Sequence, residues 1–346
     1  MTSGRRRKLV LALLLGVSLA VIAAEIAART LFGTPWPERL PILRVEADPE
    51  RGWRMVPNEG HYTYDRWVSV NELGLRGPDP APKSPEVVRV LALGDSLVYG
   101  QGVGDAETMP VYLEDELNAR DEHGRRWEVL NAGHRAYDTR QELALLEQLG
   151  PVLAPDVVVL FWFHNDLFGR DIESTYESLR ASGPIAFDTG DRFEGFDRLR
   201  WRGRQLVRRS ALVMWLYDLW LNPDAKHEVD PNGLEPRFAT MGEQLERFLE
   251  LEREGGFQLL FGVVPFGPAL SAASDGQDAH WGQALEQRAL RLARDKGIPA
   301  ALLDQDVRAL MAETGRPPII PFDGHYLPEG NRALARSAAS FVLGVL

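Results

Sequence analysis

The chain has 346 residues, of which 45% are hydrophobic and 26% are charged, and its formal net charge is -11. These fractions are ordinary for a globular protein, and the acidic balance argues against nucleic acid as the main partner, because phosphate binding needs a basic surface. The sequence contains no cysteine, which excludes disulfides, thiolate metal sites and cysteine nucleophiles.

The N-terminus carries a basic cluster followed by an apolar run. Residues 5–8 are basic, residues 9–24 are uncharged, Glu25 interrupts, and the apolar character continues to residue 32. This length suits a spanning helix of about 20 residues, and the basic cluster before it predicts a cytoplasmic N-terminus. We therefore expect residues 1–32 to form a single-pass membrane anchor, with the rest of the chain extracytoplasmic, in the periplasm or at the cell surface. A signal peptide cleaved after the small residues before Glu25 is the alternative.

The next segment, residues 33–86, is rich in proline, glycine and charge. It is expected to form a stalk and an irregular lead-in to the main domain. Within it, residues 62–64 and 67–70 have the composition of a short hairpin.

Residues 87–346 alternate strand-like and helix-like segments. Five segments are apolar on both faces, which predicts strands covered on each side, and the segments between them show helical spacing. This alternation predicts a three-layer α/β/α domain around a parallel sheet of about five strands. The expected strands are residues 87–93, 127–130, 157–163, 259–264 and 300–303, and the expected helices are residues 108–120, 141–149, 276–296 and 331–346.

Residues 167–235 interrupt the alternation and are expected to form an insertion or cap. Six arginines between residues 198 and 209 precede an apolar segment, residues 211–221, that contains Trp215 and Trp220. One interpretation is a cap helix packed on the domain. The other is an amphipathic helix on the membrane surface, with the tryptophans at the headgroups and the arginines on anionic lipid.

A serine follows the first predicted strand, in Gly94-Asp95-Ser96. Ligands of open α/β sheets bind beyond the carboxyl ends of the strands, so Ser96 is a candidate nucleophile. A serine hydroxyl is a poor nucleophile at neutral pH and needs a base that is itself oriented. His325 is the best candidate base, and Asp323 is close enough in sequence to hold its second ring nitrogen.

Three groups are candidate donors for an oxyanion hole: the backbone N–H of Ser96, the backbone N–H of Gly133 and the side-chain amide of Asn165. Each lies just after a predicted parallel strand, so all three are expected at the same edge of the sheet. Donors there would stabilise the negative charge that develops on an ester carbonyl oxygen.

Four other residues are candidates for the surroundings of this site. Asp95 is expected to orient the serine turn through hydrogen bonds. His164 either lines the pocket or packs among aromatic residues, and His134 and Tyr137 are candidates for the acyl-acceptor side. No two histidines have metal-ligand spacing on a predicted helix, so we expect no metal and no cofactor.

Taken together, four of these segments resemble the GDSL-type, or SGNH, serine hydrolases. The segment from Gly94 to Leu97 is similar to the nucleophile block of that family, and Gly133 is similar to its glycine block. Asn165 is similar to the asparagine block, and Asp323 with His325 is similar to the last block. The resemblance extends from about residue 87 to the end of the chain, with the insertion outside it.

The resemblance implies a flavodoxin-like SGNH hydrolase fold and metal-free acyl-ester chemistry. It implies Ser96 as the nucleophile, His325 as the base and Asp323 as its orienting partner. Ser96, Gly133 and Asn165 would then form the oxyanion hole.

Two positions depart from the family pattern. Phe163 stands where the third block usually has glycine. Only Gly324 separates the aspartate and histidine of the last block, where two residues are usual. The shorter spacing is similar to that of acetyltransferase-type relatives that modify bacterial polysaccharides, and a common variant among plain hydrolases is the alternative.

We therefore expect a membrane-anchored serine esterase whose substrate is an acyl ester, O-acetyl or of another short chain, on a carbohydrate or a lipid. With water as acceptor the enzyme is a hydrolase, and with a sugar hydroxyl it is an O-acyltransferase that modifies an envelope polysaccharide. Two alternatives come from other classes: a non-catalytic module that binds acylated glycans, and a structural protein of the envelope.

Overall fold

The computed structural model describes residues 3–169, 171–187, 195–221, 231–265 and 277–346. The chain divides into two compact units. The first comprises Met1–Glu38, Phe193–His227 and Ile320–Gly324, and the second comprises Arg39–Arg192, Glu228–Ile319 and His325–Leu346.

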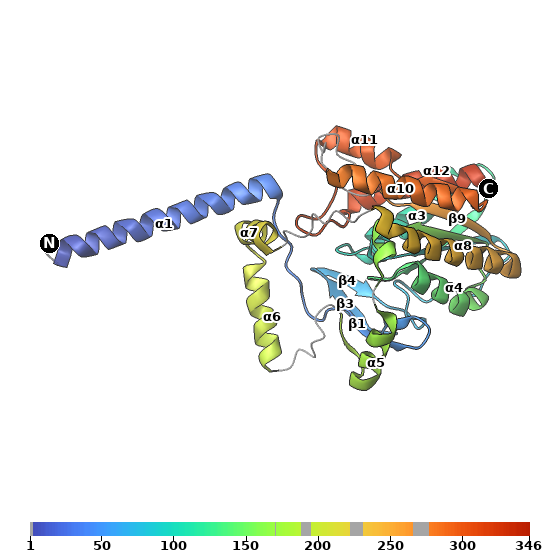
Figure 1. Cartoon of the computed structure of the whole chain (residues 1–346), viewed down its shortest axis with the longest axis horizontal. Helices are drawn as coiled ribbons and strands as arrows, with labels where there is room; N and C mark the ends of the chain where they lie inside the picture. Colours follow the sequence, from blue (N-terminus) through green and yellow to red (C-terminus); the bar gives the residue numbers. More distant parts are fainter. Residues whose placement is uncertain (1–2, 170, 188–194, 222–230, 266–276) are drawn as a thin grey trace. The chain divides into compact units, whose positions relative to one another are not determined.

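A five-stranded parallel sheet forms the centre of the second unit (Figure 1). Its three central strands are buried along most of their length, as expected for segments that are apolar on both faces. All five predicted strands are confirmed, with ends that differ by up to three residues. They are β5 (Val87–Gly94), β6 (Arg126–Gly133), β7 (Val157–Trp162), β9 (Gln258–Val263) and β10 (Ala300–Leu302).

The strand order in this sheet is β10-β9-β7-β5-β6. In chain order the first strand therefore lies between the second and the third, which is the flavodoxin-like arrangement. The order reverses between β5 and β7, and ligands of such folds bind beyond the carboxyl ends of the strands at that point. The residues after β5 and β7 therefore lie where folds of this type place a ligand-binding site.

Helices cover both faces of the sheet and complete the three layers. Side chains alternate across a strand, so Val90 packs with α3, α11 and α12, whereas Leu91 packs with α4, α8 and α10. The four predicted helices are confirmed as α3, α4, α10 and α12, while α8 and α11 were not predicted. The bounds are α3 (Met109–Arg120), α4 (Thr139–Leu153), α8 (Glu235–Gly255), α10 (Gln277–Asp295), α11 (Gln305–Thr314) and α12 (Pro328–Val345).

Residues 39–77 contribute four short strands to the second unit. The predicted hairpin is confirmed as β3 (Gly60–Thr63) and β4 (Arg66–Ser69). A second, unpredicted antiparallel pair joins β1 (Arg44–Asp48) to β2 (Gly52–Met55), and β8 (Ile185–Ala186) from the insertion adds to β1. Short helical segments complete the unit: η1 (Asp105–Glu107), α2 (Ser96–Tyr99), η2 (His164–Phe168), α5 (Ile172–Ser182) and η4 (Pro231–Leu234).

The first unit is built around helix α1 (Ser3–Phe32). Its segment Gly4–Phe32 is, by length and composition, apolar enough to cross a membrane, and none of its most apolar window is buried. Two helices of the insertion belong to the same unit, α6 (Phe196–Val207) and α7 (Ala211–Leu221). The side chain of Trp220, which the sequence analysis singled out, lies outside the described residues.

Candidate active site

Ser96 is the first residue of helix α2 and follows directly on strand β5. Asp95 caps this helix, because its Oδ1 accepts a hydrogen bond from the backbone N–H of Leu97 at 2.8 Å. The strand and the capped helix fix the Ser96 backbone at the carboxyl edge of the sheet, beside the point where the strand order reverses. The side chain of Ser96 remains partly exposed.

His325 lies beside this serine, although 229 positions separate them in the sequence. Its Nε2 is 2.7 Å from the Ser96 Oγ, a hydrogen-bond distance. The next residue, Tyr326, is buried and donates its hydroxyl to the Pro265 carbonyl at 3.0 Å, and helix α12 begins two residues later. The histidine is therefore carried on a backbone that packing holds in place.

Asp323 belongs to the first unit, whereas His325 belongs to the second. The backbone N–H of Asp323 donates to the Ile320 carbonyl at 3.2 Å, within a turn in which Phe322 and Gly324 both have positive φ. The role of Asp323 as orienting partner of His325 remains a prediction from the sequence.

Asn165 lies on η2, just after β7, and is tied to the serine turn. Its Nδ2 donates to Asp95 Oδ2 at 2.8 Å. A primary amide has two N–H donors, so this bond leaves one for a substrate oxygen. Burial raises the pKa of Asp95, and the bonds from Leu97 and Asn165 act in the opposite direction. Asp95 thus connects Asn165 to the Ser96 turn, which agrees with its expected orienting role.

Gly133 ends strand β6 and lies against helix α2. A Cβ at this position would come within 2.1 Å of the Tyr99 backbone nitrogen, so only glycine fits. Its own N–H donates to Asn131 Oδ1 at 3.0 Å. To act in an oxyanion hole, this N–H would have to leave Asn131 and donate to the substrate oxygen. In the following turn, Ala136 has a positive φ of 58°, and its N–H donates to no other residue within the described part of the chain.

These residues agree with the outcome of a family comparison. The sequence profile of the GDSL-like lipase/acylhydrolase family matches residues 92–333, well over half of the chain. The chain belongs to this family. It is accordingly a serine ester hydrolase.

Solved structures that resemble this GDSL-like hydrolase are distant in sequence. An acetyl xylan esterase, AlAXEase, has 13% identity and a TM-score of 0.43, with 73% of this chain and 98% of that chain covered. TesA has 16% identity and a TM-score of 0.42, with 75% and 99% covered. The psychrotrophic esterase EstA from Pseudoalteromonas sp. has 12% identity and a TM-score of 0.40, with 74% and 96% covered. No curated protein matches the chain.

Among the remaining candidates, His164 packs against aromatic rings. Its ring centroid lies 4.1 Å from that of Phe163 and 5.6 Å from that of Trp281, edge to face in both cases. Burial lowers the pKa of His164 to about 4, so the ring is neutral near pH 7. This environment fits a packed histidine better than a general base.

His134 and Tyr137 stack on each other, with ring centroids 4.1 Å apart, and both are buried. The Tyr137 hydroxyl donates to the Trp53 carbonyl at 2.6 Å, and burial lowers the pKa of His134 to about 3. Both side chains therefore lie in the core next to the Gly133 loop, and a direct role on the acyl-acceptor side remains a prediction.

Sequence reasoning missed that residues 39–77 supply side chains that hold helix α2 in place. The buried guanidinium of Arg76 donates to the carbonyls of Tyr99 and Gly100 at 2.7 Å each, and to that of Val103 at 2.7 Å. His61 Nε2 lies 2.5 Å from the Tyr99 hydroxyl. Arg76 thus satisfies carbonyls at the end of α2 that the helix leaves unpaired, and fixes the helix that begins with Ser96.

A second missed feature is a pair of buried carboxyl groups, Glu142 and Asp166. Neither oxygen of Glu142 has a hydrogen-bond partner among the described residues, and Asp166 Oδ2 accepts from the Phe163 N–H at 3.1 Å. Burial raises the pKa of both groups well above the usual range. The negative charge of Asp95 raises the pKa of Glu142 further, and the charges of Glu142 and Asp95 do the same for Asp166. Nothing in the sequence distinguishes these acids from ordinary exposed ones.

The Glu142→Gln variant is expected to be more stable than the wild type at pH 8, with a gain that shrinks toward pH 5. The folded protein holds a proton on Glu142 that the unfolded chain releases above its ordinary pKa, so Glu142 lowers the free energy of unfolding as pH rises. Glutamine keeps the neutral shape without this cost. Thermal unfolding midpoints of the full chain in detergent across this range measure the effect, with the exposed Glu313→Gln as control. A gain independent of pH would contradict the assignment.

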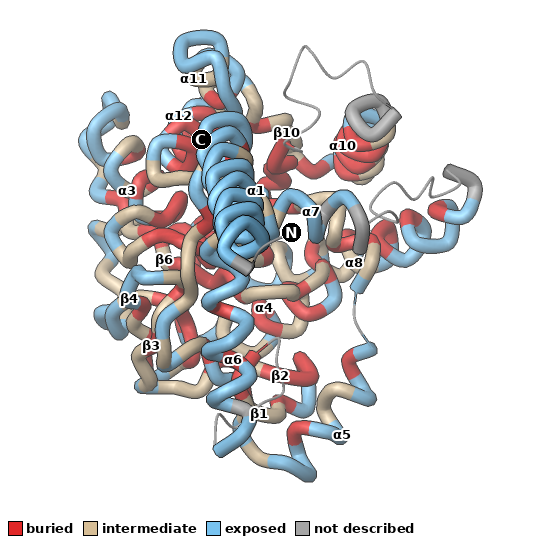
Figure 2. Tube along the Cα trace, turned by 90° about the vertical axis from the view of Figure 1, so that its left-hand side faces the viewer, coloured by how far each residue is buried: buried red, intermediate tan, exposed pale blue. Residues whose placement is uncertain are grey.

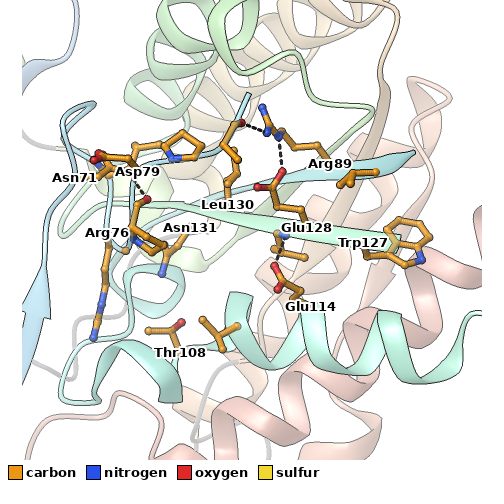
Figure 3. Close-up of a pocket in the computed structure, with 18 of the residues that line it drawn as sticks. Asn71, Arg76, Asp79, Arg89, Thr108, Glu114, Trp127, Glu128, Leu130 and Asn131 are labelled. Carbon is orange, nitrogen blue, oxygen red and sulfur yellow. Dashed lines mark hydrogen bonds and ion pairs between the residues drawn. The ribbon is translucent and has the colours of Figure 1, made fainter. Parts of the chain in front are cut away.

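A pocket of about 580 Å³ lies along strand β6, and Arg76 and Asn131 are among the residues that line it (Figure 3). Neither Ser96 nor His325 lines this pocket. Several polar side chains that line it are paired with other groups of the protein. Glu114 accepts from the Val129 N–H at 2.8 Å, and Arg89 pairs with Glu128 at 2.6 Å. Among the described residues no group of three or more His, Asp or Glu side chains is arranged to hold a metal ion.

Proposed function

We propose that the protein hydrolyses short-chain acyl esters through an acyl-enzyme on Ser96. The observation that carries the proposal is the 2.7 Å distance between Ser96 Oγ and His325 Nε2. A nucleophile and a base at hydrogen-bond distance are the signature of nucleophilic serine chemistry.

In the first half-reaction, Ser96 Oγ bonds to the ester carbonyl carbon while its proton passes to His325 Nε2. This transfer requires the tautomer with a proton on Nδ1, and Asp323 is proposed to stabilise that proton. The tetrahedral intermediate then expels the alcohol oxygen, which takes the proton from Nε2. The products are the free alcohol and an ester of Ser96.

Negative charge on the carbonyl oxygen is proposed to be stabilised by the Ser96 N–H, the Gly133 N–H and the free N–H of Asn165 Nδ2. Ala136 is a second candidate for the backbone donor, because its N–H has no partner among the described residues. Each such donor contributes about 10²–10³-fold in rate. The Asn165 amide is held by its bond to Asp95, whose Oδ1 accepts from the Leu97 N–H next to Ser96.

In the second half-reaction, an acceptor hydroxyl gives its proton to His325 and attacks the acyl carbon, and Ser96 leaves with the proton returned. Water gives a free acid, and a sugar hydroxyl gives a new ester. Acyl transfer to a sugar hydroxyl is the second candidate function. It is suggested by the single residue between Asp323 and His325, a spacing similar to that of acetyltransferase-type relatives.

Helix α1 is proposed to anchor the enzyme in a membrane, with the catalytic domain outside the cytoplasm. The support is its length and apolar composition, together with the basic residues 5–8 that precede it. The substrate is then an ester at the cell envelope, on a carbohydrate or a lipid.

The test uses the full chain in detergent with p-nitrophenyl esters of increasing acyl length, with and without oligosaccharide acceptors. We expect acetate and butyrate esters to be cleaved faster than long-chain esters, and free acid to be the main product. Acylated oligosaccharide as the main product would replace hydrolysis by transfer. No turnover of any ester would contradict both.

A further inference from the structure

Glu25, the acidic residue within the apolar helix α1, binds the start of helix α7. Its carboxylate accepts hydrogen bonds from Ser210 Oγ at 2.6 Å, from the Ala211 N–H at 3.1 Å and from the Leu212 N–H at 3.0 Å. These are backbone donors that a helix leaves unpaired at its N-terminus, and a carboxylate there also complements the helix dipole. Helix α7 is therefore capped by a side chain from α1.

Two further contacts hold α7 to α1. The Arg29 guanidinium bonds to Glu25 at 2.6 Å and also donates to the Arg209 carbonyl at 2.6 Å. The rings of Phe32 and Trp215 stack with centroids 5.9 Å apart. The last two turns of α1 and the first turns of α7 thus form one packed structure.

This packed region lies at the C-terminal end of α1, far along the helix from the basic residues 5–8. A hydrocarbon core about 30 Å thick takes about 20 helical residues, so a span that begins at Leu9 ends at Ala28. Glu25 and Arg29 then lie at the boundary between acyl chains and headgroups. Helix α7 begins at that level, and α6 immediately precedes it in the chain.

Helix α6 presents an apolar stripe to solvent. At 3.6 residues per turn, Phe196, Leu199, Leu206 and Val207 lie on one face. All four are exposed, with Phe196 at 72% and Leu206 at 71%. Most of α6 is coloured as exposed in Figure 2. Large apolar side chains gathered on one exposed face mark an interaction surface.

The opposite face of α6 is held to the protein. Gln205 is buried and exchanges two hydrogen bonds with Glu38, at 3.0 and 2.8 Å, and Arg208 pairs with the same carboxylate at 3.3 Å. These contacts fix the rotation of α6 about its axis and leave the stripe facing outward.

Arginines border the stripe on both sides, with Arg200 along one edge and Arg202 along the other, and both are exposed. Long basic side chains in this position can reach phosphates while the apolar residues between them enter the acyl region. Within the first unit α6 runs crosswise to α1 (Figure 1). A helix crosswise to a spanning helix lies in the plane of the membrane.

We propose that α6 and α7 form a membrane-surface element, in which the α6 stripe enters the outer boundary of the bilayer and its arginines bind anionic phospholipid. The proposal rests on the proposed anchoring role of α1. Its occupant is the lipid surface rather than a protein, because the arginines flank the stripe and the Glu25 cap places the element at the level where headgroups begin.

The test uses single cysteines, which this cysteine-free chain accepts without background labelling. Spin labels are placed at Leu199 and Leu206 on the stripe, at Arg208 on the opposite side of α6, and at Val17 in the middle of α1. The full-length variants Leu199→Cys, Leu206→Cys, Arg208→Cys and Val17→Cys are reconstituted in nanodiscs of phosphatidylcholine with phosphatidylserine. Collision with oxygen and with a water-soluble nickel chelate is measured by power saturation.

We expect labels at Leu199 and Leu206 to favour oxygen over nickel, as the Val17 label does, and the Arg208 label to favour nickel. Omitting phosphatidylserine should raise nickel access at the two stripe positions. A Val17 label in lipid together with stripe labels in water would contradict this proposal but would still support α1 as a membrane anchor. Stripe labels shielded from both reagents would show a protein partner instead, and a Val17 label in water would remove the anchor and the proposal with it.

Discussion

Replacement of Ser96 by alanine is expected to lower kcat for ester hydrolysis by about 10⁶-fold, the loss typical of removing a serine nucleophile. The Ser96 hydroxyl, 2.7 Å from His325 Nε2, is the group that would form the acyl-enzyme, and alanine cannot form that ester bond. Because Asn165 and the backbone donors remain in place, a slow residual rate and substrate binding should survive.

The matched control is Ser174→Ala, on the exposed surface of α5. Its rate should equal that of the wild type, as measured with p-nitrophenyl acetate on the full chain. Equal rates for Ser96→Ala and Ser174→Ala would remove Ser96 from the mechanism.

The second large effect is expected for Gly133→Ala. The new Cβ would lie 2.1 Å from the Tyr99 nitrogen and 2.6 Å from the Val98 carbonyl carbon, which are backbone atoms that cannot rotate away. Either β6 or α2 must shift, at a cost of about 3 kcal/mol for overpacking. A shift of α2 by about 1 Å displaces Ser96 from His325 and costs about 10²-fold in rate.

The control for this variant is Gly242→Ala, within helix α8. There the nearest atom to a new Cβ is the flexible Lys296 Cε at 3.4 Å, so alanine should be neutral or slightly stabilising. Thermal unfolding and esterase rate of the full chain are the measurements. A Gly133→Ala variant with the wild-type unfolding midpoint and rate would contradict the close packing of β6 on α2.

The parallel sheet could be predicted because burial on both faces leaves a plain mark in the sequence. Residues 157–162 are apolar without interruption, and β7 is buried at every one of them. Strands β1 and β2 carry no such mark. They are four or five residues long and include charged groups. One of these, the buried Asp48 at the end of β1, pairs with Arg51 in the turn before β2, with N and O atoms 2.7 Å apart.

The proximity of Ser96 and His325 could be predicted from the residue types and from the sheet edge at which Ser96 follows a strand. Some of the contacts around these two residues could not be predicted, because they depend on how distant segments pack together. Arg76, for example, reaches the end of α2 from the segment of residues 39–77. The burial of Glu142 likewise follows from packing and not from the pattern of its helix.

The pairing of Ser96 with His325 is tested most directly by a fluorophosphonate probe that reports the reactivity of serine hydroxyls. Peptide mass spectrometry of the labelled full chain should place one phosphonyl group on Ser96, and His325→Ala should slow that labelling severely. Labelling of another residue, or labelling of Ser96 at an unchanged rate without the imidazole, would contradict the account.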